Sequence, residues 1–171
     1  MAIKSIALIT AISTVASLLS GLALPETATV ERSAVIDASP EQVYELLESS
    51  AGFQSFNPYK DTDPNLDIQL HGPAKGIGSA FSFKGKEGKG TQTIIDLDPN
   101  RQVTMKIDLG ARGQPIQTFT LTPVDGGTEV RWAVASSFGY NPLKRVFGLF
   151  MDRFMGGTLT RGLGNLQALH S

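Results

Sequence analysis

Apolar and polar residues alternate with a period of two through much of the chain, which predicts β-strands. Residues 103–109 are the clearest case, because Val, Met, Ile and Leu there alternate with Thr, Lys and Asp. Similar patterns predict strands near residues 29–37, 66–71, 80–84, 91–97, 119–121 and 129–134. Clusters of Gly, Pro, Asn and Asp separate the six strands after residue 60, with no helical pattern between them. This arrangement predicts an antiparallel meander with one face toward water.

Two short helical segments are predicted directly after the first strand. Ser39 suits the N-cap of a helix over residues 40–49, Pro40 suits its first position, and Gln42 completes a capping box. The stretch GFQSFNPY at residues 52–59 then predicts a second short helix or turn, which ends at an Asn-Pro pair. This stretch gathers three aromatic residues in eight positions, either as ordinary core or as the lining of a ligand site.

The chain ends in a long helical pattern over residues 142–169, with Asn141 as a suitable N-cap. Its apolar residues form two stripes that lie about a third of a turn apart around the helix. The first stripe is Leu143, Val146, Phe147, Phe150, Met151 and Phe154, and the second is Met155, Leu159, Leu163 and Leu166. The pair Gly156-Gly157 between them predicts a bend. Together with Gly162 and Gly164, it indicates either close packing against the helix or a marginal helix held by its contacts.

Residues 5–24 carry no charged side chain over 20 positions, and Lys4 is the only charged side chain before them. A helix of this length spans about 30 Å, the hydrocarbon thickness of a bilayer. Two interpretations stay open: a membrane anchor, which we favour, or a cleaved signal peptide. Residues 1–25 are therefore expected to form the anchor or signal, and residues 26–171 the folded domain. The positive-inside rule places the domain on the extracytoplasmic (periplasmic) side, or outside the cell after cleavage.

Composition narrows the possible function classes. A hydrophobic content of 41% and a charged content of 18% are typical of a globular domain. The net charge is −1 and no run of Lys or Arg occurs, so nucleic-acid binding is not expected. The chain has no cysteine, which excludes disulfides, zinc–thiolate sites and thiol nucleophiles. No motif for a metal or a cofactor is present, and none is predicted.

Five short motifs follow one another along the chain: VERSAVIDASPEQVYELL, GFQSFNPY, GIGSAFSFKG, GGTEVRWAV and GLGNLQAL. In this order they resemble the polyketide cyclase/dehydrase and lipid-transport superfamily (SRPBCC), which includes START domains and birch-pollen-allergen-like (Bet v 1-like) proteins. The similarity covers residues 28–169. The apolar segment ending in Leu-Pro before the first strand is similar to a bacterial, membrane-anchored branch. Residues 158–160 read Thr-Leu-Thr where members often carry an acid, so this chain departs from the family pattern at that point.

The resemblance implies an α+β helix-grip fold, in which a curved seven-stranded antiparallel sheet wraps around a long C-terminal helix. It also implies two short helices after strand 1, an N-terminal hydrophobic helix, and a hydrophobic cavity between the sheet and the last helix. The residues then expected to line a ligand site are Phe53, Phe56, Tyr59, Phe81, Phe83, Met105, Phe119, Trp132, Phe147, Phe150, Phe154 and Arg32. From spacing alone, the apolar members are equally expected in the core of any sheet-on-helix domain. Arg32 would point inward to bind a carboxylate or phosphate, or extend to solvent from its strand.

The sequence offers no catalytic constellation. His71 is expected at a solvated strand edge, and no partner for it as a catalytic base is evident. Asp96 and Asp108 occupy polar strand positions and are expected to face water. Three functions stay open: binding or transport of a hydrophobic small molecule or lipid, a cyclase- or dehydratase-type enzyme, and a structural domain with a filled interior. The missing catalytic set favours the first.

Overall fold

The computed structural model describes residues 23–171, so the hydrophobic helix expected at the N-terminus lies almost wholly outside the described residues. The strands are β1 (Thr27–Ile36), β2 (Asp67–His71), β3 (Ala80–Gly85), β4 (Gly88–Asp98), β5 (Gln102–Asp108), β6 (Ile116–Val124) and β7 (Gly127–Ser137). The helices are α2 (Pro40–Leu47), α3 (Ser50–Phe56), α4 (Tyr59–Thr62), the 3₁₀ turn η1 (Gly110–Arg112), α5 (Pro142–Gly148) and α6 (Met151–Ala168). Between residues 23 and 171, no helix has both the length and the apolar character needed to cross a membrane.

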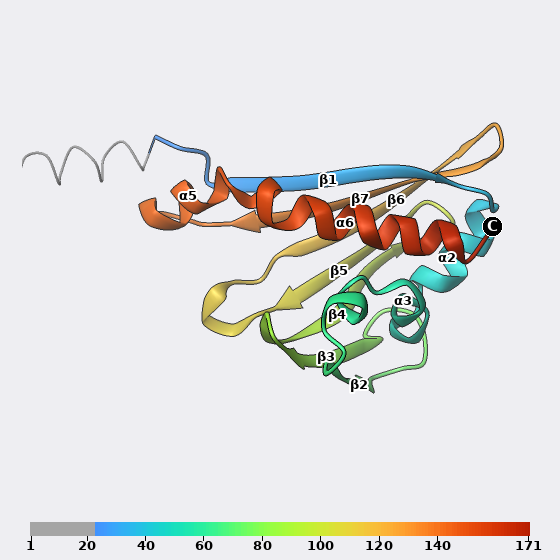
Figure 1. Cartoon of the computed structure of the whole chain (residues 1–171), viewed down its shortest axis with the longest axis horizontal. Helices are drawn as coiled ribbons and strands as arrows, with labels where there is room; N and C mark the ends of the chain where they lie inside the picture. The colour runs from blue at the N-terminus through green and yellow to red at the C-terminus, as the bar shows by residue number, and fades with distance from the viewer. Residues whose placement is uncertain (1–22) are drawn as a thin grey trace, which may run out of the picture.

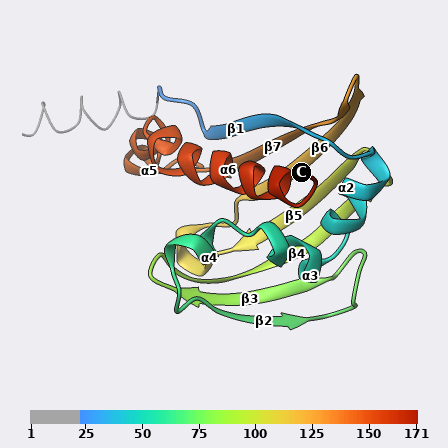
Figure 2. The same ribbon diagram turned by 45° about the vertical axis from the view of Figure 1, so that its right-hand side comes forward.

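The seven strands form one antiparallel sheet in the order β1-β7-β6-β5-β4-β3-β2. The sheet curves, and α6 lies along its concave side, where it contacts β1 and β7 (Figure 1, Figure 2). The predicted seven-stranded antiparallel sheet and α+β architecture are confirmed. One detail differs: Leu70 was expected on an apolar face but is 54% exposed, because β2 is the edge strand at the far side of the sheet from α6.

Three short helices, rather than the predicted two, follow β1. The capping box at the start of α2 is confirmed, since the Gln42 side chain accepts a hydrogen bond from the Ser39 N–H at 2.9 Å and the Ser39 hydroxyl accepts one from the Gln42 N–H. After α3, the side chain of Asn57 accepts a hydrogen bond from the Tyr59 N–H at 3.0 Å. This bond supports a new turn of helix beyond Pro58, which is why the chain continues into α4 instead of stopping there.

The C-terminal helix is broken at Leu149-Phe150, and not at the predicted glycine pair. Helix α6 runs through Gly156-Gly157 without interruption, and its buried stripe consists of Met151, Gly156, Leu159, Gly162, Leu163 and Leu166. Gly162 rests against the indole ring of Trp132, where any Cβ would collide with the ring. The close-packing interpretation therefore explains Gly162. Glycine lowers the intrinsic helix propensity here, and the close contact between α6 and Trp132 of the sheet offsets this cost.

Most members of the first apolar stripe of the predicted long helix are exposed, and Met151 is its one buried member. Phe147, Phe150 and Phe154 are 53%, 52% and 62% exposed, although the sequence placed all three in the interior. Met151 and Met155 face the sheet instead. Successive residues of a helix point about 100° apart, so turning the two methionines inward carries the neighbouring phenylalanines outward.

Candidate functional site

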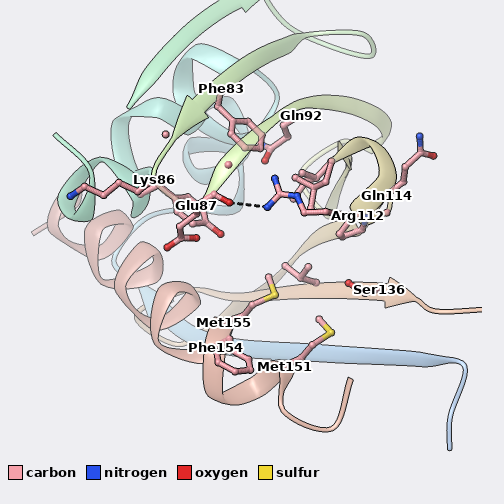
Figure 3. Close-up of a pocket in the computed structure, with 18 of the residues that line it drawn as sticks. Phe83, Lys86, Glu87, Gln92, Arg112, Gln114, Ser136, Met151, Phe154 and Met155 are labelled. Atoms are coloured by element: carbon pink, nitrogen blue, oxygen red, sulfur yellow. Dashed lines mark hydrogen bonds between the residues drawn. The ribbon is translucent and has the colours of Figure 1, made fainter. Parts of the chain in front are cut away.

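A cavity of about 650 Å³ lies between the concave face of the sheet and the N-terminal half of α6 (Figure 3). The sheet contributes Phe81, Phe83, Gln92, Ile107, Val134 and Ser136, and the last two helices contribute Phe147, Met151, Phe154 and Met155. The remaining walls come from α3, α4 and two connections, at residues 85–88 and 109–115. This volume falls within the range of about 300–1,000 Å³ that is usual for small-molecule sites.

Packed aromatic rings fill the interior next to the cavity, beneath α3. The ring of Phe53 lies 5.0 Å from that of Phe56 and 6.1 Å from that of Trp132, edge to face in both cases. The rings of Phe119 and Trp132 are 4.8 Å apart. All four side chains are at most 2% exposed, so this part of the interior is solid core. Phe53 belongs to both regions, because its ring also lines the cavity.

The exposed lining residues mark the mouth of the cavity. Lys86, Glu87, Arg112 and Lys144 are all exposed and come from the β3–β4 turn, the β5–β6 connection and α5. Arg112 Nη1 donates a hydrogen bond to the Glu87 carbonyl at 2.8 Å (Figure 3). Its Nη2 donates one to the Lys89 carbonyl at 3.2 Å. Arg112 thus joins two sides of the mouth. The four side chains give the mouth a surplus of positive charge.

Two glutamines lie buried on the inner face of the sheet. Gln92 and Gln117 are 5% and 2% exposed, and each donates a side-chain N–H to the sulfur of Met105, at 3.0 and 3.3 Å. Gln92 also lines the cavity. Its amide oxygen has no hydrogen-bond partner among residues 23–171 and can accept one from a bound molecule. Sequence reasoning missed both residues, although Gln92 shares a strand phase with Ile94 and Gln117 shares one with Phe119.

Tyr59 and Asp63 are titratable groups deeper in the cavity wall. Burial, helped by the nearby negative charge of Glu87, raises the pKa of Tyr59 to about 12, so its hydroxyl is neutral at physiological pH and can donate or accept a hydrogen bond. Asp63 is buried, and its two carboxylate oxygens accept the backbone N–H groups of Asn65 at 3.2 Å and Lys86 at 2.6 Å. These bonds hold the β3–β4 turn against α4, which is a structural role.

A family comparison matches nearly all of the described chain. The model of the family described as polyketide cyclase / dehydrase and lipid transport matches residues 27–170. The chain belongs to this family. Members of the polyketide cyclase / dehydrase and lipid transport family are associated with hydrophobic ligands or with cyclase-type reactions, and the apolar cavity is consistent with either. No protein of curated function is significantly similar in sequence.

Solved structures of low sequence identity share the fold of this family member. Protein CV1439 from Chromobacterium violaceum has a TM-score of 0.57 at 17% identity, over 84% of this chain and 96% of the other. Ara h 8.0201 has a TM-score of 0.59 at 15% identity, over 83% and 99%. The di-domain ARO/CYC StfQ, from the steffimycin biosynthetic pathway, has a TM-score of 0.61 at 12% identity, over 84% of this chain and 50% of StfQ. These likenesses establish the fold.

The residues predicted to bind a ligand fall into three groups according to where they lie in the structure. Those that line the cavity are Phe53, Tyr59, Phe81, Phe83, Phe147 and Phe154. Those that lie in the packed core outside its lining are Phe56, Met105, Phe119 and Trp132. Phe150 and Arg32 lie outside the cavity altogether. The aromatic stretch at residues 52–59 therefore supplies both core and cavity wall.

Arg32 faces α6 but does not reach the cavity. Its Nη1 lies 2.7 Å from Oδ1 of Asp152, and its guanidinium passes across Gly156, where a Cβ would collide with it. The hydrogen bond from Arg32 lowers the pKa of Asp152 below its ordinary value. Arg32 was considered as a partner for the carboxylate or phosphate of a ligand, and here it pairs with a carboxylate of the protein's own last helix.

The three titratable residues that the sequence was searched for as catalytic groups lie outside the cavity lining. His71 and Asp96 are exposed, and none of His71, Asp96 and Asp108 lines it. Asp108 accepts hydrogen bonds from the Gly110 N–H at 2.8 Å and the Gln114 side chain at 3.0 Å, which order the β5–β6 connection. Across residues 23–171, no three His, Cys, Asp or Glu residues are grouped as a metal site requires.

We expect the Tyr59 hydroxyl to make the stability of the fold depend on pH only at high pH. Because its folded-state pKa is raised from 10.0 to about 12, its contribution is complete below pH ~10 and is lost as the pH rises towards ~12. The Tyr59→Phe variant should therefore lose less stability than the wild type over this interval. Urea unfolding followed by circular dichroism at several pH values measures the difference. Parallel curves for the two proteins would contradict the prediction.

Proposed function

We propose that the protein binds or carries a hydrophobic small molecule or lipid in the cavity between the sheet and α6. The observation that carries the proposal is an interior space of about 650 Å³ beside a core that is otherwise closely packed. Phenylalanine and methionine form much of its wall. Such apolar surface contributes about 25 cal/mol per Å² when a ligand removes it from water.

The placement of polar groups favours an amphipathic ligand. An apolar body would lie against Phe81, Phe83 and Met155, where a polar atom would find few partners. The Gln92 amide oxygen and the Tyr59 hydroxyl offer hydrogen bonds to one polar group along that body. A charged or strongly polar end would lie at the mouth, where Lys86 and Lys144 favour an anion.

The other two hypotheses receive less support. A structural domain with a filled interior would leave no space of this size beside the sheet. An enzyme would need a titratable group free to exchange a proton with the substrate, and both oxygens of Asp63 are occupied by backbone N–H groups. The neutral Tyr59 hydroxyl, deep in the wall, and the exposed Glu87 carboxylate at the mouth remain as candidates for such chemistry.

We also propose that residues 5–24 hold the domain at a membrane, on its extracytoplasmic side. Support comes from the 20 uncharged residues, preceded only by Lys4, and from the acidic Glu26 that follows them. The folded domain would then lie next to a source of apolar molecules. If the segment is a signal peptide instead, the mature chain is secreted and the cavity is unchanged.

Native mass spectrometry of residues 23–171, purified from cells without detergent, tests the binding proposal. The buried hydrophobic core lies entirely between residues 30 and 166, so this fragment contains all of it. A co-purifying mass of a few hundred daltons, extractable into organic solvent, is expected. A bare protein mass, together with no uptake of a fluorescent naphthylamine probe, would refute the proposal.

A further inference from the structure

Hydrophobic side chains are concentrated on the surface at one end of the molecule. Seven of the thirteen large hydrophobic side chains exposed on residues 23–171 lie within 15 consecutive positions. They are Tyr140, Leu143, Val146, Phe147, Leu149, Phe150 and Phe154, and we refer to them as the α5 surface. Tyr140 and Leu143 are 85% and 76% exposed. Exposed apolar residues that are clustered, rather than scattered singly, mark a surface that binds something.

The α5 surface is an ordered part of the fold. Asn141 caps α5 through a hydrogen bond from the Lys144 N–H, at 3.1 Å. The rings of Phe147 and Phe154 stack across the break between α5 and α6, with their centroids 5.6 Å apart. The segment is therefore held in place while its apolar side chains remain in contact with water.

The charges around the α5 surface are mainly positive. Lys144 and Arg153 are exposed and form no ion pair with any residue in the range 23–171. The one acidic side chain in this stretch, Asp152, is paired with Arg32. Exposed apolar residues flanked by cations are typical of segments that lie in the interface of a bilayer containing anionic lipids.

The chain is tied to α5 at the end of its uncharged segment. Arg145 is 5% exposed; its Nη1 donates to the Leu24 carbonyl at 2.9 Å and its Nη2 to Oε1 of Glu26 at 3.0 Å. Residues 5–24 are long enough to cross a bilayer. If this segment enters a bilayer, Arg145 keeps α5 next to the point of entry. The α5 surface would then lie close to the bilayer, because few residues separate the end of the apolar segment from the contacts of Leu24 and Glu26 with Arg145.

We propose that the α5 surface docks on an anionic lipid bilayer and brings the mouth of the cavity to it. Phe147 and Phe154 belong to both the α5 surface and the cavity lining, and Lys144 between Leu143 and Val146 also lines the cavity. The α5 surface and the mouth of the cavity are therefore continuous. An apolar molecule leaving the bilayer would then reach the cavity without crossing bulk water. The docking proposal rests on the exposed side chains and on the charges, and does not depend on what the cavity holds.

Site-directed fluorescence on the full chain tests the proposal, because the native sequence has no cysteine. One variant, Leu143→Cys, carries an environment-sensitive dye on the α5 surface. The control, Asp125→Cys, carries it in the β6–β7 turn, at the opposite end of the molecule (Figure 1). Each protein is reconstituted with vesicles of phosphatidylcholine and phosphatidylglycerol that contain a spin-labelled quenching lipid. We expect several-fold stronger quenching at position 143 than at position 125.

A second pair of substitutions separates docking from simple attachment through residues 5–24. Leu149→Asp and Phe150→Asp place charges on the α5 surface, and neither residue lines the cavity. Together they should remove most of the quenching at position 143 and leave naphthylamine uptake unchanged. Equal quenching at positions 143 and 125, or quenching that survives both substitutions, would overturn the proposal. So would shielding of the position 143 dye from iodide without vesicles, because residues 1–22 or a second copy would then cover the surface.

Discussion

Truncation of Trp132 to alanine should lower the free energy of unfolding by about 3–5 kcal/mol. The indole is 1% exposed and contacts the rings of Phe53, Phe56 and Phe119. It also supports α6 at Gly162, so its removal leaves a void between the sheet and the helix. Because the variant lacks the chain's only tryptophan, urea unfolding should be followed by far-ultraviolet circular dichroism.

The matched control is Phe154→Ala, which removes an aromatic ring that is 62% exposed. Its cost should stay below about 1 kcal/mol, since surface truncations seldom cost more. If Trp132→Ala proves too unstable to purify, Trp132→Phe should fold with a smaller loss. A Trp132 variant as stable as Phe154→Ala would mean that α6 is not held against the sheet at this point.

Replacement of Ser136 by tryptophan should weaken naphthylamine binding at least about tenfold, equivalent to about 1.4 kcal/mol. Ser136 is a small residue of β7 that lines the cavity, and it lies on the same strand face as Val134 (Figure 3). A tryptophan side chain there would occupy space that a ligand needs. Titration of the purified protein with the probe, followed by its fluorescence, measures the change.

Ala135→Trp is the matched control for the Ser136 substitution. Ala135 is the preceding residue on the same strand, and its side chain points to the opposite face of the sheet, away from the cavity. This variant should bind the probe as the wild type does. Equal loss of binding in both variants would indicate a general effect on folding, and unchanged binding in Ser136→Trp would place the probe outside the cavity.

Much of the fold follows from local patterns in the sequence. Period-two alternation identified most of the strands, because a strand with one face toward the interior and one toward water alternates apolar and polar residues. The pattern over residues 91–97 was mixed, and the edge strand β2 is largely exposed on both faces. The capping box at Ser39 and the N-cap at Asn141 were also correct, since they depend on neighbouring residues alone.

The candidate site was less predictable, because it depends on how elements pack. The last helix was predicted to bend at Gly156-Gly157, but it breaks at Leu149-Phe150 instead, and the inward turn of Met151 leaves Phe150 outside the interior. A register shift between Ile94 and Asp96 changes which residues of β4 face inward, and no simple alternation reveals it. The mouth is formed by residues from the β3–β4 turn and the β5–β6 connection, whose proximity only the folded sheet creates.

If the cavity holds a ligand as proposed, the two hydrogen bonds of Arg112 bear on how long that ligand stays inside. They fasten the β5–β6 connection to Glu87 of the β3–β4 turn at 2.8 Å and to Lys89 at the start of β4 at 3.2 Å. Widening the mouth on this side requires both bonds to break, and the guanidinium must then find other partners or be hydrated. Residence time would therefore be governed by this side chain, while affinity would be governed by the apolar walls behind it.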